Sequence, residues 1–509
     1  MRRGILVLAF CGFGCSDGSG KQPPPGPQPA GLSTDTIAAF DAAVDPLRQK
    51  FDVPGVAVAL VSRGETVFAQ GYGLRDLESG ESVTPDTVFR IGSITKSFSS
   101  ALIATLVDDG ALTFETRVKD IDPSFQLPTA ELTDKMTIHE LLGMGTGLGE
   151  ASAFWWDFPT AGDLLATLPE LDVIGPEGTF FYNNEVYASG TYLALEAAKP
   201  DGDLATAYAR LVNERLFAPL GMSPAAVTDD PSTLGSDVAA SYTLSLVGGP
   251  DAPDRAGFVP MASVAPAGAV ATNVTSLARY AAMQLAQGVA ADGTRVVSAE
   301  NLAVTHAPQT RITPAPAPWL TDYAAGWAVG KEGGVNVVWH DGALDGYSAT
   351  LRLLPDDDLA LVILTNGWNG ENLCLALEEK LMQLVYGHAD LGPDYFTAAY
   401  ATARKQLAAA AAALALEAPI DPHAVAPLLG DWGHELSVEL DDANELFLVA
   451  PGSRSRVVRA DKLFKTDGVY LLAGGPLVGH EVRVAATDGH SEFSVLDPAS
   501  GEPILSLAR

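Results

Sequence analysis

Strand-forming segments lie at both ends of a long stretch of this sequence, and helical patterns separate them. An apolar hairpin, Val56 to Val61 and Thr66 to Gly71, follows a helical pattern over Asp35 to Phe51. The second group of strands is an antiparallel meander with glycine-rich turns: Gly326 to Val329, Val335 to Trp339, Tyr347 to Leu354 and Leu359 to Thr365. A helix over Glu371 to Tyr386 closes this meander. We therefore predict an α/β (α+β) fold, in which one antiparallel sheet from both chain ends is flanked by helices and carries an inserted helical region.

The inserted region shows apolar residues at helical spacing. Its predicted helices are Ser93 to about Asp109, Ile138 to Leu142, Gly162 to Leu168, Asp203 to Leu216 and Thr275 to Gln287. Late in the chain, short strand-like segments such as Leu436 to Leu440 and Glu481 to Ala485 return. These late strands indicate a separate small all-β, barrel-like domain.

A chain of 509 residues is long enough for more than one core. We expect a lipoprotein-type signal peptide at 1–15 and a Pro/Gly-rich linker at 16–34. The main α/β domain is predicted at 35–390. An Ala-rich helical connector is expected at 391–416, and the small β domain at 417–509.

The N-terminus has the pattern of an exported protein. Arg2 and Arg3 precede an apolar run from Gly4 to Phe13, and Cys15 follows a small residue. We predict that Cys15 is lipidated, with ordinary cleavage or retention of the leader as the alternatives. The protein is then expected in the cell envelope, facing the periplasm, with membrane contact only through this N-terminal lipid anchor.

Composition narrows the classes of partner and cofactor. A net charge of −32, with no cluster of Lys and Arg, argues against a nucleic-acid partner. No His or Cys cluster has metal-ligand spacing, and we expect no cofactor and no metal. Cys374 is the only cysteine in the body of the chain, and its place in an apolar helical pattern predicts a buried, inert thiol.

Ser93-Ile94-Thr95-Lys96 is the only S-x-x-K motif in the chain. Residues three apart on a helix share a face, so Ser93 and Lys96 meet at the start of the predicted helix. A lysine in that setting loses hydration, its pKa falls, and its neutral amine can take the serine proton during attack on a carbonyl. The alternative interpretation is an N-capping serine followed by a surface lysine.

Two further motifs occur once each, Tyr182-Asn183-Asn184 (Y-x-N) and His340-Asp341-Gly342 (H-x-G). Each alone also fits a turn, with a packed tyrosine or a histidine at a strand end. In the order S-x-x-K, Y-x-N, H-x-G they resemble the penicillin-binding-protein and class C beta-lactamase superfamily. Other matching segments, within a resemblance that covers roughly Thr36 to Gly387, are Val53 to Val58, Phe89 to Gly92, Thr137 to Leu142, Pro266 to Gly268, Leu277 to Tyr280, Gly326-Trp327 and Leu364 to Asn366.

The resemblance implies a beta-lactamase/transpeptidase-like domain with a serine nucleophile. Ser93 would be acylated, Lys96 would assist as base, and Tyr182 would share the proton relay as a phenolate or phenol. Asn184 would hold the substrate amide or Lys96 itself. The late β domain resembles the lipocalin-like C-terminal extension of some members.

The resemblance also implies an oxyanion hole made by two backbone N–H groups, that of Ser93 and that of Ala343, which follows Gly342. His340 stands where the family commonly has the lysine of K-T-G, which supplies a fixed positive charge for the carboxylate of penicillins and of C-terminal D-Ala. Histidine, largely neutral at neutral pH, supplies that charge poorly. Lys331-Glu332-Gly333 could supply the charge instead, but the following Gly334 indicates a hairpin turn.

The expected function is hydrolysis of an ester or amide, of esterase or D-amino-acid peptidase type, through an acyl-enzyme on Ser93. Expected substrates are a small-molecule ester, a D-amino peptide or a peptidoglycan-derived compound. The alternative within enzymes is a D-Ala-D-Ala carboxypeptidase or weak beta-lactamase. The alternative outside enzymes is a catalytically silent envelope binding protein.

Overall fold

The computed structural model describes residues 32–150, 160–245, 249–256, 261–315, 317–344 and 346–389, and separate stretches after residue 400. The predicted leader, Cys15 and most of the Ala-rich connector lie outside these residues, so the predicted segmentation of the chain remains a prediction. Among the helices that the structure describes, none combines the length and apolarity needed to cross a bilayer.

The main sheet is antiparallel, and within the described residues it has eight strands in the order β2-β1-β13-β12-β11-β10-β9-β8. The strands are β1 (Gly55–Ser62), β2 (Glu65–Gly73), β8 (Thr310–Arg311), β9 (Leu320–Tyr323), β10 (Ala328–Glu332), β11 (Val335–Leu344), β12 (Tyr347–Leu354) and β13 (Leu359–Thr365). Val56 of β1 pairs with Thr365 of β13. The prediction that strands from both ends of the domain form one sheet is therefore confirmed.

Helices cover both faces of this sheet. Helices α1 (Thr34–Lys50) and α12 (Gly370–Tyr386) contact each other, and α12 packs on β12 and β13. Helix α10 (Val274–Leu285) packs against β1 and β13. All of β13 and nearly all of β1 are buried, as expected of strands with both faces covered.

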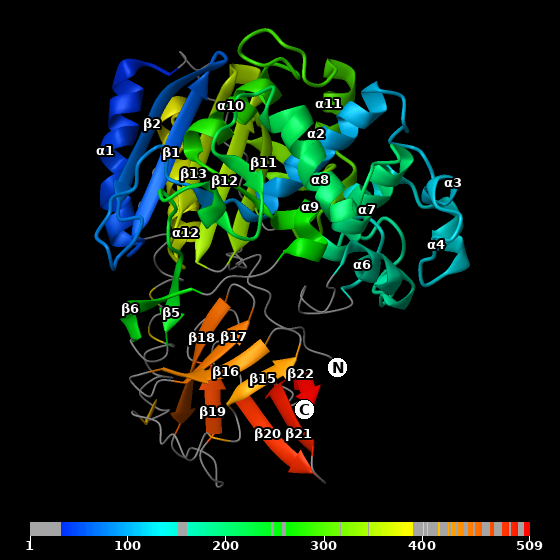
Figure 1. The fold of residues 1–509 in the computed structure, drawn as a ribbon. Helices are drawn as coiled ribbons and strands as arrows, with labels where there is room; N and C mark the ends of the chain where they lie inside the picture. Colours follow the sequence, from blue (N-terminus) through cyan, green and yellow to red (C-terminus); the bar gives the residue numbers. More distant parts are fainter. Residues whose placement is uncertain are drawn as a thin grey trace.

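The inserted helical region lies to one side of the sheet (Figure 1). Its α-helices are α2 (Thr95–Asp108), α3 (Val118–Ile121), α4 (Ala130–Lys135), α5 (Ile138–Leu142), α6 (Ala161–Thr167), α7 (Asn184–Ala197), α8 (Leu204–Val212), α9 (Ala265–Gly268) and α11 (Ala299–His306). Helix α7 was not predicted from the sequence. Its residues are buried from Glu185 to Leu195, so it lacks the alternation of apolar and polar faces that identifies a surface helix.

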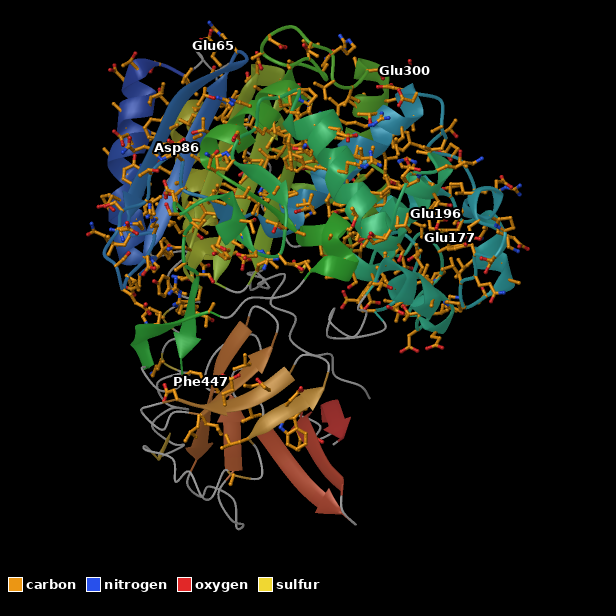
Figure 2. All side chains as sticks on the ribbon, in the orientation of Figure 1. Glu65, Asp86, Glu177, Glu196, Glu300 and Phe447 are labelled. Atoms are coloured by element: carbon orange, nitrogen blue, oxygen red, sulfur yellow. The ribbon has the colours of Figure 1, made fainter. Side chains whose placement is uncertain are left out.

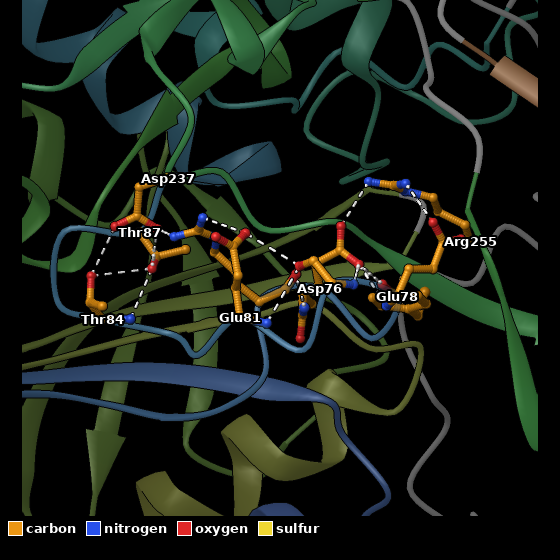
Figure 3. Close-up of polar contacts among 11 residues, drawn as sticks. Asp76, Glu78, Glu81, Thr84, Thr87, Asp237 and Arg255 are labelled. Atoms are coloured by element: carbon orange, nitrogen blue, oxygen red, sulfur yellow. Dashed lines mark hydrogen bonds and ion pairs between the residues drawn. The ribbon is translucent and has the colours of Figure 1, made fainter.

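A small sheet of β3 (Phe89–Arg90), β7 (Val270–Thr272) and β4 (Ala225–Val227) leads the chain toward Ser93. The segment before β3 is fixed by Asp237, whose carboxylate accepts hydrogen bonds from Thr87 (2.7 Å) and Thr84 (3.0 Å) and pairs with Arg75 (2.7 Å) (Figure 3). Next to Asp237, Val238 bridges to Val88. The contacts of Asp237 therefore hold in place the segment that leads into the S-x-x-K motif.

A hairpin of β5 (Tyr242–Ser245) and β6 (Gly249–Arg255) joins the same polar network. Arg255 pairs with Asp76 at 3.3 Å (Figure 3). The Tyr242 hydroxyl accepts the backbone N–H of Leu77 at 2.7 Å. The loop after β2 is thus tied both to this hairpin and to Asp237.

Acidic side chains are spread over the main domain. The labelled residues Glu65, Asp86, Glu177, Glu196 and Glu300 come from separate strands, loops and helices (Figure 2). The excess of negative charge in the sequence is therefore distributed over several elements and is not confined to one segment.

The late strands form an antiparallel ladder in the order β15 to β22, with β14 paired to β18. Their bounds are β14 (Leu416–Glu417), β15 (Gly430–Gly433), β16 (Leu436–Leu440), β17 (Leu446–Ala450), β18 (Ser453–Ala460), β19 (Val469–Leu472), β20 (Glu481–Thr487), β21 (His490–Leu496) and β22 (Pro503–Ala508). The predicted late strands are confirmed. β15 and β22 contact each other, but no ladder between them is found in the described part of the chain, so a closed barrel remains a prediction.

Candidate active site

Ser93 lies in a 3₁₀ turn, Gly92–Ile94, that precedes α2, so the α-helix begins slightly later than predicted. Gly92 has φ +50°, and a Cβ at this residue would lie 2.8 Å from the backbone N of Ala343. A Cβ at Gly342 would lie 1.9 Å from the carbonyl oxygen of Ile91. The turn therefore packs directly against the backbone of β11, and this contact requires glycine on both sides.

Lys96 is fully buried, one helical turn after Ser93. Its Nζ donates to Ser93 Oγ (3.0 Å), Asn184 Oδ1 (2.7 Å) and the carbonyl of Ala267 (2.8 Å). Burial lowers the pKa of Lys96 to about 7, because the charged form is poorly solvated. The surface-lysine interpretation is therefore wrong. The capping-serine interpretation is also wrong, since no side chain caps α2.

Tyr182 faces the same pair of residues. Its hydroxyl shares a hydrogen bond with Ser93, and the Lys96 Nζ lies 4.8 Å from the centre of its ring. Burial raises the pKa of Tyr182 well above its usual value, which favours the phenol over the phenolate. Asn183 holds this segment in place, because its side chain caps α7 and donates to the carbonyl of Gly149 at 2.9 Å.

His340 lies inside β11, which continues to Leu344, and not beyond the end of the strand as predicted. Pairing with β12 continues through Gly342 and Ala343, and this pairing excludes the hairpin-turn interpretation of H-x-G. His340 Nδ1 lies 2.6 Å from the carbonyl of Asp341 and must donate to it. Nε2 is then the acceptor for the hydroxyl of Tyr323 at 3.0 Å.

The imidazole of His340 is neutral at physiological pH. Burial, together with the nearby Lys96, lowers the pKa of His340 to about 3. Lys331, the alternative source of charge, lies beside the Gly333-Gly334 turn between β10 and β11, as predicted. Cys374 is buried, and burial raises the pKa of its thiol well above the usual value, as expected of an inert cysteine.

The backbones of Ser93 and Ala343 run side by side. A Cβ at Gly342 would lie 3.1 Å from the Ser93 backbone N, and a Cβ at Gly92 would lie 2.8 Å from the Ala343 backbone N. The backbone N–H groups of Ser93 and Ala343, which belong to different elements, therefore lie in two segments that pack against each other. The structure brings together all of the predicted site residues other than Cys15: Ser93, Lys96, Tyr182, Asn184, His340, Gly342 and Ala343.

Three further groups at the site were not assigned a role from the sequence. The carbonyl of Ala267 accepts from Lys96, and Tyr323 donates to His340. The carboxylate of Glu150 accepts the backbone N–H of Asn184, and burial beside Glu185 raises the pKa of Glu150 to about 7. Ala267 lies in the Pro266-Ala267-Gly268 segment, which resembles the family in the sequence. Tyr323 and Glu150 lie in no recognisable motif.

Comparisons with known proteins agree with this geometry. The Beta-lactamase family profile matches residues 40–380. Penicillin-binding protein 4 of Amycolatopsis lactamdurans is 29% identical over 336 residues, which are 65% of this chain and 85% of that protein. Unguisins hydrolase ungD' of Aspergillus campestris is 28% identical over 373 residues, which are 70% of this chain and 66% of that protein.

Solved structures share the fold at low sequence identity. The octameric penicillin-binding protein homologue from Pyrococcus abyssi gives a TM-score of 0.58 at 18% identity, over 93% of this chain and 100% of that one. The structure of SurE with D-Leu gives 0.55 at 22% identity, over 94% and 100%. A class C beta-lactamase from Rhodobacter sphaeroides gives 0.55 at 20% identity, over 69% and 99%. With its matched profile, its sheet and its inserted helices, the chain belongs to the beta-lactamase family of serine hydrolases.

Proposed function

We propose that this serine hydrolase cleaves an ester or amide of esterase or D-amino-acid peptidase type, through an acyl-enzyme on Ser93. The observation that carries the proposal is the contact between Ser93 Oγ and a buried lysine amine at 3.0 Å. A lysine whose pKa is about 7 is neutral in a large fraction of molecules at neutral pH and can act as a base.

In the first step of the proposed reaction, Ser93 Oγ attacks the substrate carbonyl while the Lys96 amine takes the proton of the Ser93 hydroxyl. The N–H groups of Ser93 and Ala343 stabilise the resulting oxyanion. The proton then passes through the Tyr182 phenol to the leaving alcohol or amine, and the acyl-serine ester remains. A water molecule then attacks the acyl-serine ester. One proton of this water passes through Lys96 and Tyr182 to Ser93 Oγ, and the acid and free Ser93 are released.

The residues of H-x-G favour substrates without a carboxylate at this position. His340 is neutral, and the neighbouring Asp341 carboxylate lies 3.7 Å from His340 Nδ1 with its side chain 34% exposed. A penicillin or D-Ala-D-Ala carboxylate would meet no fixed cation from this motif. The similarity to a structure solved with D-Leu supports D-amino compounds as candidates.

Substrate preference tests this proposal. We expect turnover of a p-nitrophenyl ester or a D-amino-acid p-nitroanilide by the purified chain, and little turnover of a penicillin or cephalosporin. Absorbance assays measure each rate, and intact-mass spectrometry after fluorophosphonate treatment measures acylation. Cephalosporin turnover as fast as ester turnover would favour the beta-lactamase alternative. An unlabelled and inactive protein would favour the silent binding protein.

The pH profile tests the role of Lys96. Since the neutral amine is the active form, kcat/KM should rise with pH through about 7. Glu150 raises the pKa of Lys96, so Glu150→Gln should move the acidic limb of the profile to lower pH. Glutamine still offers an oxygen to the Asn184 N–H. Profiles of kcat/KM from pH 4 to 9 measure the shift.

The matched control for this shift is Glu196→Gln. Glu196 lies on α7, the helix that Asn184 begins, but at its opposite end. Its profile should match that of the wild type. An unchanged limb in Glu150→Gln would show that Glu150 does not act on Lys96.

A further inference from the structure

Away from Ser93, three side chains with metal-ligating atoms converge where α12 ends. Glu332 ends β10, Glu379 lies in α12, and His388 follows this helix. One ligand atom from each residue lies within 4.8 Å of the other two. We propose that Glu332, Glu379 and His388 bind a divalent transition-metal ion, with zinc as the preferred ion.

The orientation of His388 presents one nitrogen to this group. A Cβ at Gly333, which has φ +56°, would lie 2.6 Å from His388 Nε2, so this side of the ring packs on the glycine backbone. The other nitrogen, Nδ1, lies 3.7 Å from Glu332 Oε1. His388 Nδ1 and Glu332 Oε1 therefore face each other, and each is available as a ligand.

The second oxygen of Glu332 is already engaged. Glu332 Oε2 pairs with Arg352, whose other arm bonds Glu378 at 2.9 Å. Glu378 also accepts from Trp339 and Thr350, so its oxygens are committed to these partners. Glu332 can thus keep its ion pair through Oε2 and offer Oε1 to a metal ion.

The balance of charge favours a cation at this place. One guanidinium, that of Arg352, faces the two carboxylates of Glu332 and Glu378, and the carboxyl group of Glu379 lies close to Glu332. Glu332 is only 10% exposed and Glu378 only 2% exposed, so solvent compensates little of this charge. A divalent cation among these side chains would balance the remaining negative charge.

The ligand atoms indicate the kind of ion. One imidazole nitrogen with carboxylate oxygens suits zinc and its first-row neighbours, whereas Mg²⁺ and Ca²⁺ prefer oxygen ligands alone. A water molecule would complete a four-coordinate site. The ion would link α12 to the β10–β11 hairpin. We therefore expect metal binding to raise the stability of the folded domain, independently of the reaction at Ser93.

The test uses the purified full chain after dialysis against a chelator. Isothermal titration calorimetry should show one equivalent of Zn²⁺ bound and much weaker binding of Mg²⁺. The melting temperature should rise with Zn²⁺ concentration, because the ion binds the folded state. Glu379→Gln and His388→Ala should each weaken Zn²⁺ binding by about tenfold or more and remove the rise in melting temperature.

The matched control is His139→Ala. The His139 side chain is 19% exposed against 21% for His388, and its Nδ1 also lies near a glutamate, Glu115, at 3.4 Å. This variant should bind Zn²⁺ like the wild type. The proposal is overturned if the wild type binds no Zn²⁺, or if Glu379→Gln and His388→Ala both fold and bind it unchanged. Glu379→Gln, nearly equal in shape, keeps the test decisive if His388→Ala fails to fold.

Discussion

Ser93→Ala should lose ester or amide turnover by at least about 10⁴-fold and lose fluorophosphonate labelling at the same time. Lys96 and Tyr182 both contact the Ser93 hydroxyl. Alanine removes this hydroxyl, so no nucleophile remains to attack the substrate. The fold should persist, because Ser93 caps no helix. Turnover assays and intact-mass spectrometry measure the two losses on the same sample.

The matched control for Ser93→Ala is Ser97→Ala. Ser97 lies on the same helix, and its hydroxyl donates to the carbonyl of Ile94 at 2.7 Å. This variant should label and turn over like the wild type. If Ser93→Ala still accepts the label, another residue is the nucleophile and the proposed mechanism fails.

Gly342→Ala should lower kcat by about 10²-fold to 10³-fold, the range seen when one oxyanion donor is lost. The added Cβ would lie 1.9 Å from the Ile91 carbonyl, so β11 and the Ser93 turn must move apart. That movement separates the N–H groups of Ser93 and Ala343. Steady-state kinetics measure the loss, and thermal melts separate local displacement from unfolding.

Gly162→Ala is the matched control for this glycine substitution. Gly162 lies in α6, and a Cβ there would meet only the Thr160 Oγ1 at the ordinary distance of 3.6 Å. Its kcat should stay at the wild-type value. A Gly342→Ala variant that is folded and fully active would exclude the proposed oxyanion hole.

Much of the fold could be predicted because its strands are separated and strongly apolar. Val56 to Val61 and Leu359 to Thr365 fit β1 and β13 closely. Strands β8 and β9 were not predicted, since Thr310–Arg311 and Leu320–Tyr323 are too short to show alternation. Their place at the edge of the sheet depends on the pairing of β9 with β10 and of β8 with β9, and strands this short leave no periodic pattern that would predict it.

The candidate site was predictable where a motif carries it. The S-x-x-K spacing is local to one helical turn, so the Ser93 to Lys96 contact follows from helix geometry. Glu150 and Tyr323 reach the site only through tertiary packing, and no local spacing reports such contacts. The same reason applies to His388 and Glu332, which are far apart in the sequence and meet only where α12 ends.

The pairing of Val56 with Thr365 also determines when this domain can fold. The first hairpin leaves the ribosome early, but its partner β13 is synthesised only after the whole helical region. Such non-local pairing folds slowly, because a long loop must close before the contacts form. The edge of β1 that pairs with β13 therefore stays open until synthesis of the domain is nearly complete, and a chain truncated before β13 would leave this apolar edge exposed to aggregation.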